Sequence, residues 1–144
     1  MSAVDDLDEA IDRYQSALGA FYKGRPEPTK ESWSHREDVS LANPLGPPAL
    51  GWDEVARTIE RAASNLRDGR MIEFEDLAKY VTPDLAYTVW LERAEARVGG
   101  RGDVTPITLR VTMVYRPEGD TWKVLHRHAD PITTARPTES IIQE

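Results

Sequence analysis

The chain has 144 residues, no cysteine and a net charge of −7, with hydrophobic and charged fractions of 40% and 30%. This is the size of one ordinary domain, large enough for a core without disulfides or metal staples. The acidic balance disfavours nucleic acid as a partner, since phosphate contacts need clustered Lys and Arg. The missing cysteines exclude disulfides, thiolate nucleophiles and Cys-ligated zinc. The chain has no apolar run of membrane-spanning length and an acidic N-terminus, so we expect a cytoplasmic protein without a membrane partner.

The first half of the sequence predicts helices and one short strand. Apolar residues recur at three- and four-residue steps from Val4 to Phe21, which predicts a helix with Ser2 or Asp5 as its N-cap. The next predicted elements are a helical turn over Pro28 to Trp33, a strand over Glu37 to Asn43, and a helix over Trp52 to Leu66 that ends at Asp68-Gly69.

The second half predicts a meander of long strands over Met71 to Val81, Ala86 to Val98, Ile107 to Arg116 and Thr121 to Ala129. Helices followed by consecutive strands indicate an α+β domain in which a curved antiparallel sheet wraps around N-terminal helices. We expect this sheet to form a cone with an open mouth. The single domain is predicted over residues 1–131, and residues 132–144 are predicted to be a loose tail.

Three segments stand out: DVSLANPLG at 38–46, GWDEV at 51–55, and the closing hairpin from RVTMVYR at 110–116 to WKVLHRH at 122–128. Together they resemble the nuclear transport factor 2-like superfamily, and within it the SnoaL-like and ketosteroid isomerase-like proteins. The hairpin also resembles the association domain of calcium/calmodulin-dependent kinase II. The resemblance covers residues 4–131 and implies the cone-shaped fold, also described as a cystatin-like α+β barrel. That fold hosts isomerases, cyclases, dehydratases and assembly domains, so the resemblance does not define a function.

The ketosteroid isomerases use an aspartate base, a tyrosine and a protonated aspartic acid. The resemblance places Tyr14 at the position of the tyrosine, Asn43 at that of the base and Thr112 at that of the acid. An amide cannot abstract a proton near neutral pH, so the isomerase mechanism is disfavoured. Asn43 and Thr112 retain the capacity to hydrogen-bond a ligand.

The last predicted strand alternates His126, His128 and Asp130, so their side chains share one face, together with Trp122 and Val124. This spacing is compatible with an acid–base pair or a metal site. A structural or interface role is favoured for Trp122 and His126, while His128 is kept as a pocket candidate. We predict no metal and no cofactor.

The isomerase-like alignment turns Thr112 and Ala129 toward the pocket, and strand alternation then places Arg110 and Arg127 there as well. Two guanidinium groups would favour a carboxylate or another anion. In the alternative, bulges shift the register and the arginines pair across the sheet with Glu73, Glu75 or Glu92.

Two functional hypotheses follow from these residues. The first is a SnoaL-like pocket domain that binds a small anionic or carbonyl-containing organic molecule, with the option of cofactor-free acid–base chemistry. Its pocket candidates are Tyr14, Asn43, Trp90, Arg110, Thr112, Arg127 and His128, with His35 and Asp38 as a further pair near the mouth. The second is a non-catalytic homodimeric assembly module, in which the outer face of the sheet pairs two copies.

Overall fold

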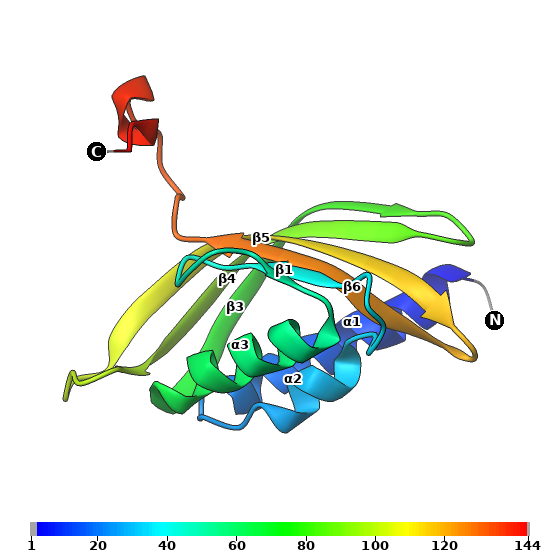
Figure 1. The fold of residues 1–144 in the computed structure, drawn as a ribbon, viewed down its shortest axis with the longest axis horizontal. Coiled ribbons are helices and arrows are strands. Elements are labelled where there is room, and N and C mark those ends of the chain that lie inside the picture. Colours follow the sequence, from blue (N-terminus) through cyan, green and yellow to red (C-terminus); the bar gives the residue numbers. More distant parts are fainter. Residues whose placement is uncertain (1–2, 144) are drawn as a thin grey trace.

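The computed structural model describes residues 3–143 and places the N-terminal helices against one side of a six-stranded sheet (Figure 1). Ser2 lies outside the described residues, as do the side chains of Val4 and Asp5. The elements are α1 (Ala3–Phe21), α2 (Glu27–Ser32), β1 (Ser40–Ala42), β2 (Ala49–Leu50), α3 (Trp52–Ser64), β3 (Leu66–Val81), β4 (Ala86–Val98), β5 (Thr105–Glu118), β6 (Thr121–Asp130) and the 3-10 turn η1 (Thr138–Ile141).

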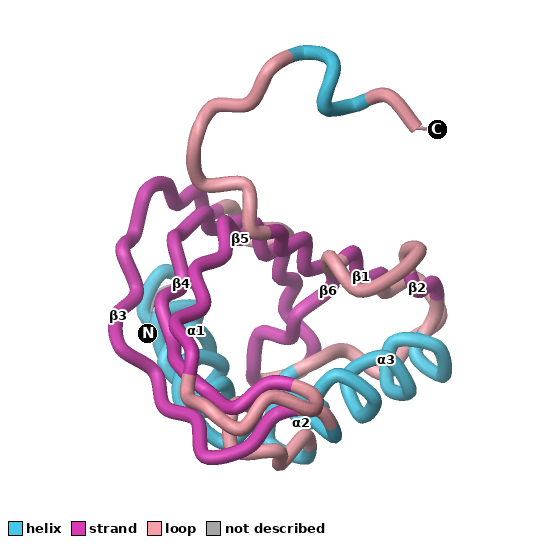
Figure 2. Tube along the Cα trace, turned by 90° about the vertical axis from the view of Figure 1, so that its left-hand side faces the viewer, coloured by secondary structure: helices cyan, strands magenta, loops and turns pink. Residues whose placement is uncertain are grey.

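The strands lie in the order β2-β1-β6-β5-β4-β3, and the sheet curls around the helices without closing (Figure 2). The predicted α+β class and cone-like arrangement are therefore confirmed. One difference concerns direction, because the short β1 pairs in parallel with β6 and makes the sheet mixed. None of the helices within residues 3–143 is long and apolar enough to cross a membrane.

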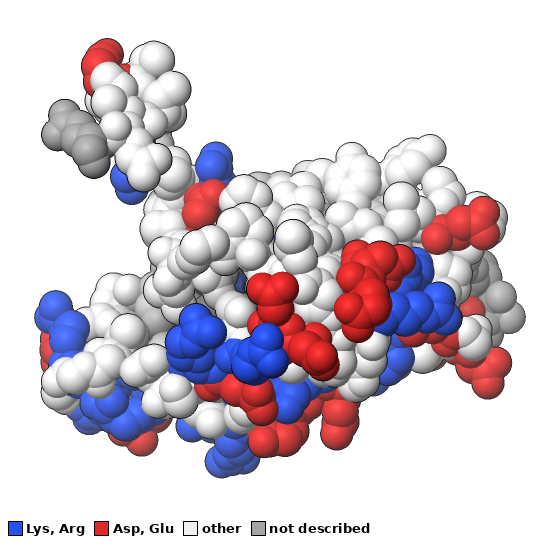
Figure 3. Space-filling view, viewed as in Figure 1, with Lys and Arg blue, Asp and Glu red and all other residues white. Residues whose placement is uncertain are grey.

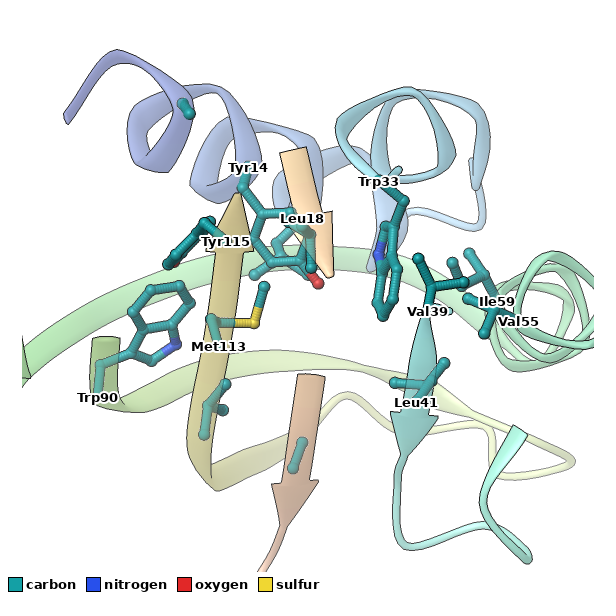
Figure 4. Close-up of a cluster of buried hydrophobic side chains, with 14 of the residues drawn as sticks. Tyr14, Leu18, Trp33, Val39, Leu41, Val55, Ile59, Trp90, Met113 and Tyr115 are labelled. Atoms are coloured by element: carbon teal, nitrogen blue, oxygen red, sulfur yellow. The ribbon is translucent and has the colours of Figure 1, made fainter. Parts of the chain in front are cut away.

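The core lies between the helices and the concave face of the sheet (Figure 4). Helix α1 buries a stripe at helical spacing against this face, as its sequence predicts. Helix α3 closes the other end of the cone with a shorter stripe. The two stripes are Leu7, Ala10, Tyr14, Ala17 and Leu18 on α1, and Val55, Ile59 and Ala63 on α3.

The predicted end of the third helix at Asp68-Gly69 is wrong, because both residues belong to β3. Asp68 has a φ of 54°, and the register of β3 shifts between Arg67 and Arg70, so the two residues form a bulge rather than a turn. The bulge presses the backbone against the end of α1. A Cβ atom on Gly69 would lie 2.2 Å from the carbonyl oxygen of Tyr22.

A second bulge decides which side chains of β6 face the helices. Val114 pairs with His126, but the next residue of β5 pairs with Val124, so Leu125 is an extra residue in β6. His126, His128 and Asp130 therefore share a face as predicted, but the placement of Trp122 and Val124 on that face is wrong. Trp122 and Val124 are buried inside the cone, whereas His126 and His128 lie on the outer face.

Candidate functional site

The centre of the cone holds an ion pair between Glu92 of β4 and Arg127 of β6. The guanidinium donates from Nη1 to Oε1 at 3.1 Å and from Nη2 to Oε2 at 2.9 Å. Glu92 is 0% exposed and Arg127 is 8% exposed. A bidentate Arg–carboxylate pair is the strong form of this interaction and fixes both side chains in orientation.

Two further donors complete the coordination of the Glu92 carboxylate. The Tyr22 hydroxyl donates to Oε2 at 2.9 Å, and the Trp90 indole N–H donates to Oε1 at 3.0 Å. The Arg127 guanidinium lies 5.9 Å from the centre of the Tyr14 ring, within the range of a cation–π contact. Burial acts to raise the pKa of Glu92, but the charge of Arg127 and the donated hydrogen bonds outweigh it and lower that pKa. The carboxylate is therefore ionised, and each of its two oxygens accepts two hydrogen bonds.

The interior tyrosines are neutral phenols. Burial raises the pKa of Tyr14, Tyr22 and Tyr115 above the ordinary value of a tyrosine. For Tyr14, the charge of the nearby Arg127 partly offsets that increase in pKa. Neither these phenols nor the saturated carboxylate of Glu92 is suited to abstract a proton near neutral pH. The interior offers hydrogen-bond donors rather than a general base.

One buried donor in the core has no partner. Among the described residues, Trp33 Nε1 is the buried side-chain nitrogen without a hydrogen bond. Figure 4 shows the Trp33 indole with its nitrogen turned toward Tyr14. A buried polar group of this kind costs stability unless it meets an acceptor such as water.

Two clefts flank α1. The α1–α2 cleft has a volume of about 590 Å³ and lies between α1, α2 and the β5–β6 hairpin. Its floor is formed by Tyr115, Trp122 and Val124, and Arg13 and Lys123 lie among its lining residues. Small residues of α1, including Ala17 and Ser16, also line it.

The α1–β3 cleft, of about 510 Å³, lies on the opposite side of α1. It is lined by Trp90 and Thr88 of β4 and by polar residues that include Asp12, Gln15 and Asp76. The Tyr115 hydroxyl forms a 2.7 Å hydrogen bond with Thr88. This pair therefore connects a side chain of one cleft with a side chain of the other.

The structure brings together three of the predicted pocket residues. Tyr14, Trp90 and Arg127 surround Glu92 inside the cone, and Arg127 pairs with Glu92 as the register-shift alternative foresaw. Glu92 was considered only as that partner, and Tyr22 and Trp33 were not predicted as part of this cluster. The usable signal for Glu92 is its even-numbered position in β4, among Ala86, Thr88, Trp90, Ala94 and Ala96, all of which are buried.

Three other pocket candidates face away from the interior. Arg110 donates to Asp130 at 2.7 Å, and His128 lies 3.1 Å from the same carboxylate. Thr112 is the partner of His128 in the β5–β6 ladder and shares its outer face. The expected inward orientation of Arg110 and Thr112 is wrong because their odd-numbered neighbours, Val111, Met113 and Tyr115, fill the inner face.

The remaining candidates form contacts outside the interior of the cone. The Asn43 side chain accepts a hydrogen bond from the Leu45 N–H at 3.0 Å within its own loop. The expected pair of His35 and Asp38 does not form, because His35 contacts the Lys30 carbonyl and stacks on Trp52, while Asp38 binds Arg116. On the outer side of the sheet, His126 Nδ1 and the Ser40 hydroxyl form a hydrogen bond of 2.8 Å. Within residues 3–143, no group of three or more His, Asp or Glu side chains could hold a metal ion.

A family model described as a SnoaL-like domain matches residues 11–133, and the chain belongs to this family. Its fold is similar to that of an NTF2-like family protein from Streptomyces avermitilis, with 21% identity over 92% of this chain and 98% of that chain and a TM-score of 0.74. An NTF2-like superfamily protein from Salmonella enterica is 18% identical over 94% of both chains, with a TM-score of 0.78. A ketosteroid isomerase-like protein from Erwinia carotovora atroseptica is 19% identical over 90% of this chain and 96% of that chain, with a TM-score of 0.72. A search of curated proteins found no match.

Proposed function

We propose that this SnoaL-like domain binds a small organic molecule with an apolar body and an anionic or carbonyl end in the α1–α2 cleft. The observation that carries the proposal is the cleft itself, whose volume of about 590 Å³ falls within the range of roughly 300–1,000 Å³ for ligand pockets. Its floor of Tyr115, Trp122 and Val124 suits an apolar body.

The polar end of the ligand is assigned from the cations beside the cleft. Arg13 donates to the Thr121 hydroxyl and Lys123 donates to the Glu31 carbonyl, and neither pairs with a carboxylate among the described side chains. Each retains its positive charge and further donors for an oxygen of the ligand. Asp12 and Glu31 also line the cleft, so the site favours one acceptor group rather than a polyanion.

The proposed activity is binding without acid–base turnover. Asn43 is used in its own loop, and the ionised Glu92 is occupied by four donated hydrogen bonds. This separates the proposed function from that of an isomerase, which requires a free base. Tyr115, at the floor of the cleft, is held by its own hydrogen bond to Thr88.

Isothermal titration with octanoate, octanol and octylamine tests the proposed ligand class. We expect octanoate to bind more tightly than the neutral and cationic probes. Arg13→Gln and Lys123→Gln should each weaken octanoate binding about three- to tenfold, the effect of losing one charge-assisted contact in a partly exposed site. Arg57→Gln, which removes an exposed arginine from α3, is the matched control and should leave binding unchanged.

A steric variant locates the site. Ser16→Phe, at an exposed position of α1 that lines the cleft, should abolish octanoate binding by filling it. Glu9→Phe, at an exposed position of the same helix that does not line the cleft, should not. Equal binding of all three probes, or full binding by Ser16→Phe, would refute the proposal.

A further inference from the structure

Four charged side chains line the α1–α2 cleft, and their charges balance. Asp12 and Arg13 are neighbours on α1, Glu31 lies near the end of α2, and Lys123 belongs to β6. Two of them are acidic and two are basic, so the lining is neutral overall, although the whole chain carries a net charge of −7. A ligand that is a simple anion would therefore meet two carboxylates as well as two cations.

None of these four side chains is neutralised by another side chain of the described residues. Elsewhere over the helices, basic and acidic side chains are intermingled (Figure 3), and some of them form ion pairs, as Lys30 does with Glu60 at 3.0 Å. The ion pairs found within residues 3–143 include none from the four charged side chains of the cleft. All four charges are therefore available to a ligand.

The two cations of the cleft are held in place by neutral groups. Arg13 Nη2 donates to the Thr121 hydroxyl at 2.6 Å, and Lys123 Nζ donates to the Glu31 carbonyl oxygen at 2.9 Å. The second contact brings the ammonium group of Lys123 beside a residue whose own side chain is an unpaired acid. Arg13 likewise directly follows an acid on α1. Both α1 and the α2–β6 side of the cleft thus present a positive group together with a negative one.

This arrangement suits a ligand that carries both charges close together and is neutral overall. A carboxylate alone is attracted by the cations and repelled by the acids, whereas an adjacent ammonium group turns that repulsion into attraction. The ammonium group has three N–H donors for carboxylate oxygens, and a carboxylate accepts from Arg and Lys. The apolar body of the same molecule would contact the cleft floor of Tyr115, Trp122 and Val124.

We propose that the ligand of the α1–α2 cleft is a zwitterion of the class of the α-amino acids with apolar side chains. Arg13 and Lys123 bind its carboxylate, and Asp12 and Glu31 bind its ammonium group. This inference rests on the proposed function and narrows its ligand class. It also gives the two acids a role, because they discriminate between a zwitterion and a simple anion.

Two ligands that differ only at their second carbon test this preference. The first, 2-aminooctanoate, is a zwitterion near neutral pH, and the second, 2-hydroxyoctanoate, is an anion of nearly the same shape. Isothermal titration gives the dissociation constant of each compound and hence their ratio. We expect 2-aminooctanoate to bind about two- to fivefold more tightly, the effect of one added ion pair in a partly exposed site. Equal binding, or tighter binding of the hydroxy acid, would overturn the inference.

Variants that neutralise the acids assign the preference to the cleft. Asp12→Asn and Glu31→Gln, both at exposed positions, should each lower the affinity for 2-aminooctanoate about two- to threefold without weakening the binding of 2-hydroxyoctanoate. The double variant should bring the ratio close to one. Glu9→Gln, which neutralises an exposed acid of α1 outside the cleft, is the matched control and should leave the ratio unchanged. A ratio that survives in the double variant would contradict the roles assigned to the two acids.

The steric variant of α1 and the octanoate titration separate this inference from the proposed function. Ser16→Phe should abolish the binding of 2-aminooctanoate as well as that of octanoate, since both occupy the same cleft. Retained binding of 2-aminooctanoate by Ser16→Phe would place that compound elsewhere and overturn the inference. Octanoate binding without any preference for the amino acid over the hydroxy acid would overturn the zwitterion alone. Absence of binding by octanoate and by both test compounds would overturn the proposed function together with it.

Discussion

Glu92 and Arg127 belong to strands that are not neighbours, because β5 lies between β4 and β6. Their side chains meet on the concave side of the sheet above Met113, whose sulfur lies 3.8 Å from Arg127 Nη1. Each charge is buried, so each depends on the other for compensation. The pair thereby links two strands that share no backbone hydrogen bonds.

The first prediction concerns this pair. Arg127→Met should destabilise the fold by about 3–5 kcal/mol, because it leaves the Glu92 carboxylate buried without its counter-ion. Urea unfolding followed by circular dichroism measures the change. Arg110→Met is the matched control, since its ion pair with Asp130 lies on the outer face, and its cost should be about 0–1 kcal/mol.

The double variant Glu92→Met/Arg127→Met should be more stable than Arg127→Met alone, because no unpaired charge remains inside the cone. A double variant that is as unstable as the sum of both single changes would argue against compensation between the two charges.

The second prediction is a pH dependence. The folded state lowers the pKa of Glu92, so its contribution to stability is present above the pKa of the unfolded chain, about 4.3 for a glutamate. It is lost as the pH falls through the still lower folded-state pKa. The stability difference between wild type and Glu92→Gln should therefore shrink below about pH 4.3.

Urea midpoints of both proteins between pH 7 and pH 3 measure this difference. The other carboxylates with lowered pKa, such as Asp130, are present in both proteins and cancel in the comparison. A difference that stays constant over the whole range would show that Glu92 is not the titrating group.

The third prediction tests the contact between β3 and the end of α1. Gly69→Ala places a methyl group against the Tyr22 carbonyl oxygen, so the backbone must move. We expect a loss of about 1–3 kcal/mol, the usual cost of overpacking. Gly100→Ala, where no heavy atom lies within 4 Å of the added Cβ, should change stability by less than about 0.5 kcal/mol. Thermal unfolding of both variants provides the comparison.

The fourth prediction concerns the bulge in β6. Deleting Leu125 makes Val124 and His126 consecutive, which preserves the inward position of Val124 and Arg127. The deletion variant should remain folded, with a moderate loss from the missing Leu125 side chain. Deleting Lys123 instead reverses the orientation of Trp122 and should abolish cooperative thermal unfolding. Unfolding of the Leu125 variant at room temperature would mean that the bulge itself is required.

The order of elements was predictable because it depends on periodicity and turn residues. The strand Ala86–Val98 has the bounds that its alternating pattern predicts, and α1 ends at Phe21 as its apolar stripe indicates. The family resemblance, carried by the closing hairpin, agrees with the SnoaL-like match over residues 11–133.

The inner and outer faces of β5 and β6 were not predictable, because the faces depend on a bulge. Leu125 is an ordinary apolar strand residue by composition, and nothing in its neighbours marks it as unpaired. The error placed Arg110 and Thr112 inside and Trp122 beside His128. Asp68-Gly69 failed for a similar reason, since a strand bulge and a helix-terminating turn use the same residue types.

The hydrogen bond between Tyr115 and Thr88 bears on the size of the ligand proposed for the α1–α2 cleft. Tyr115 lines the α1–α2 cleft and Thr88 lines the α1–β3 cleft, so this hydrogen-bonded pair lies between the two clefts. We expect that replacing the Tyr115 ring with a small side chain would widen the α1–α2 cleft toward the α1–β3 cleft. On the proposed function, that single change would favour longer ligands, while the ion pair of Glu92 and Arg127 keeps its partners.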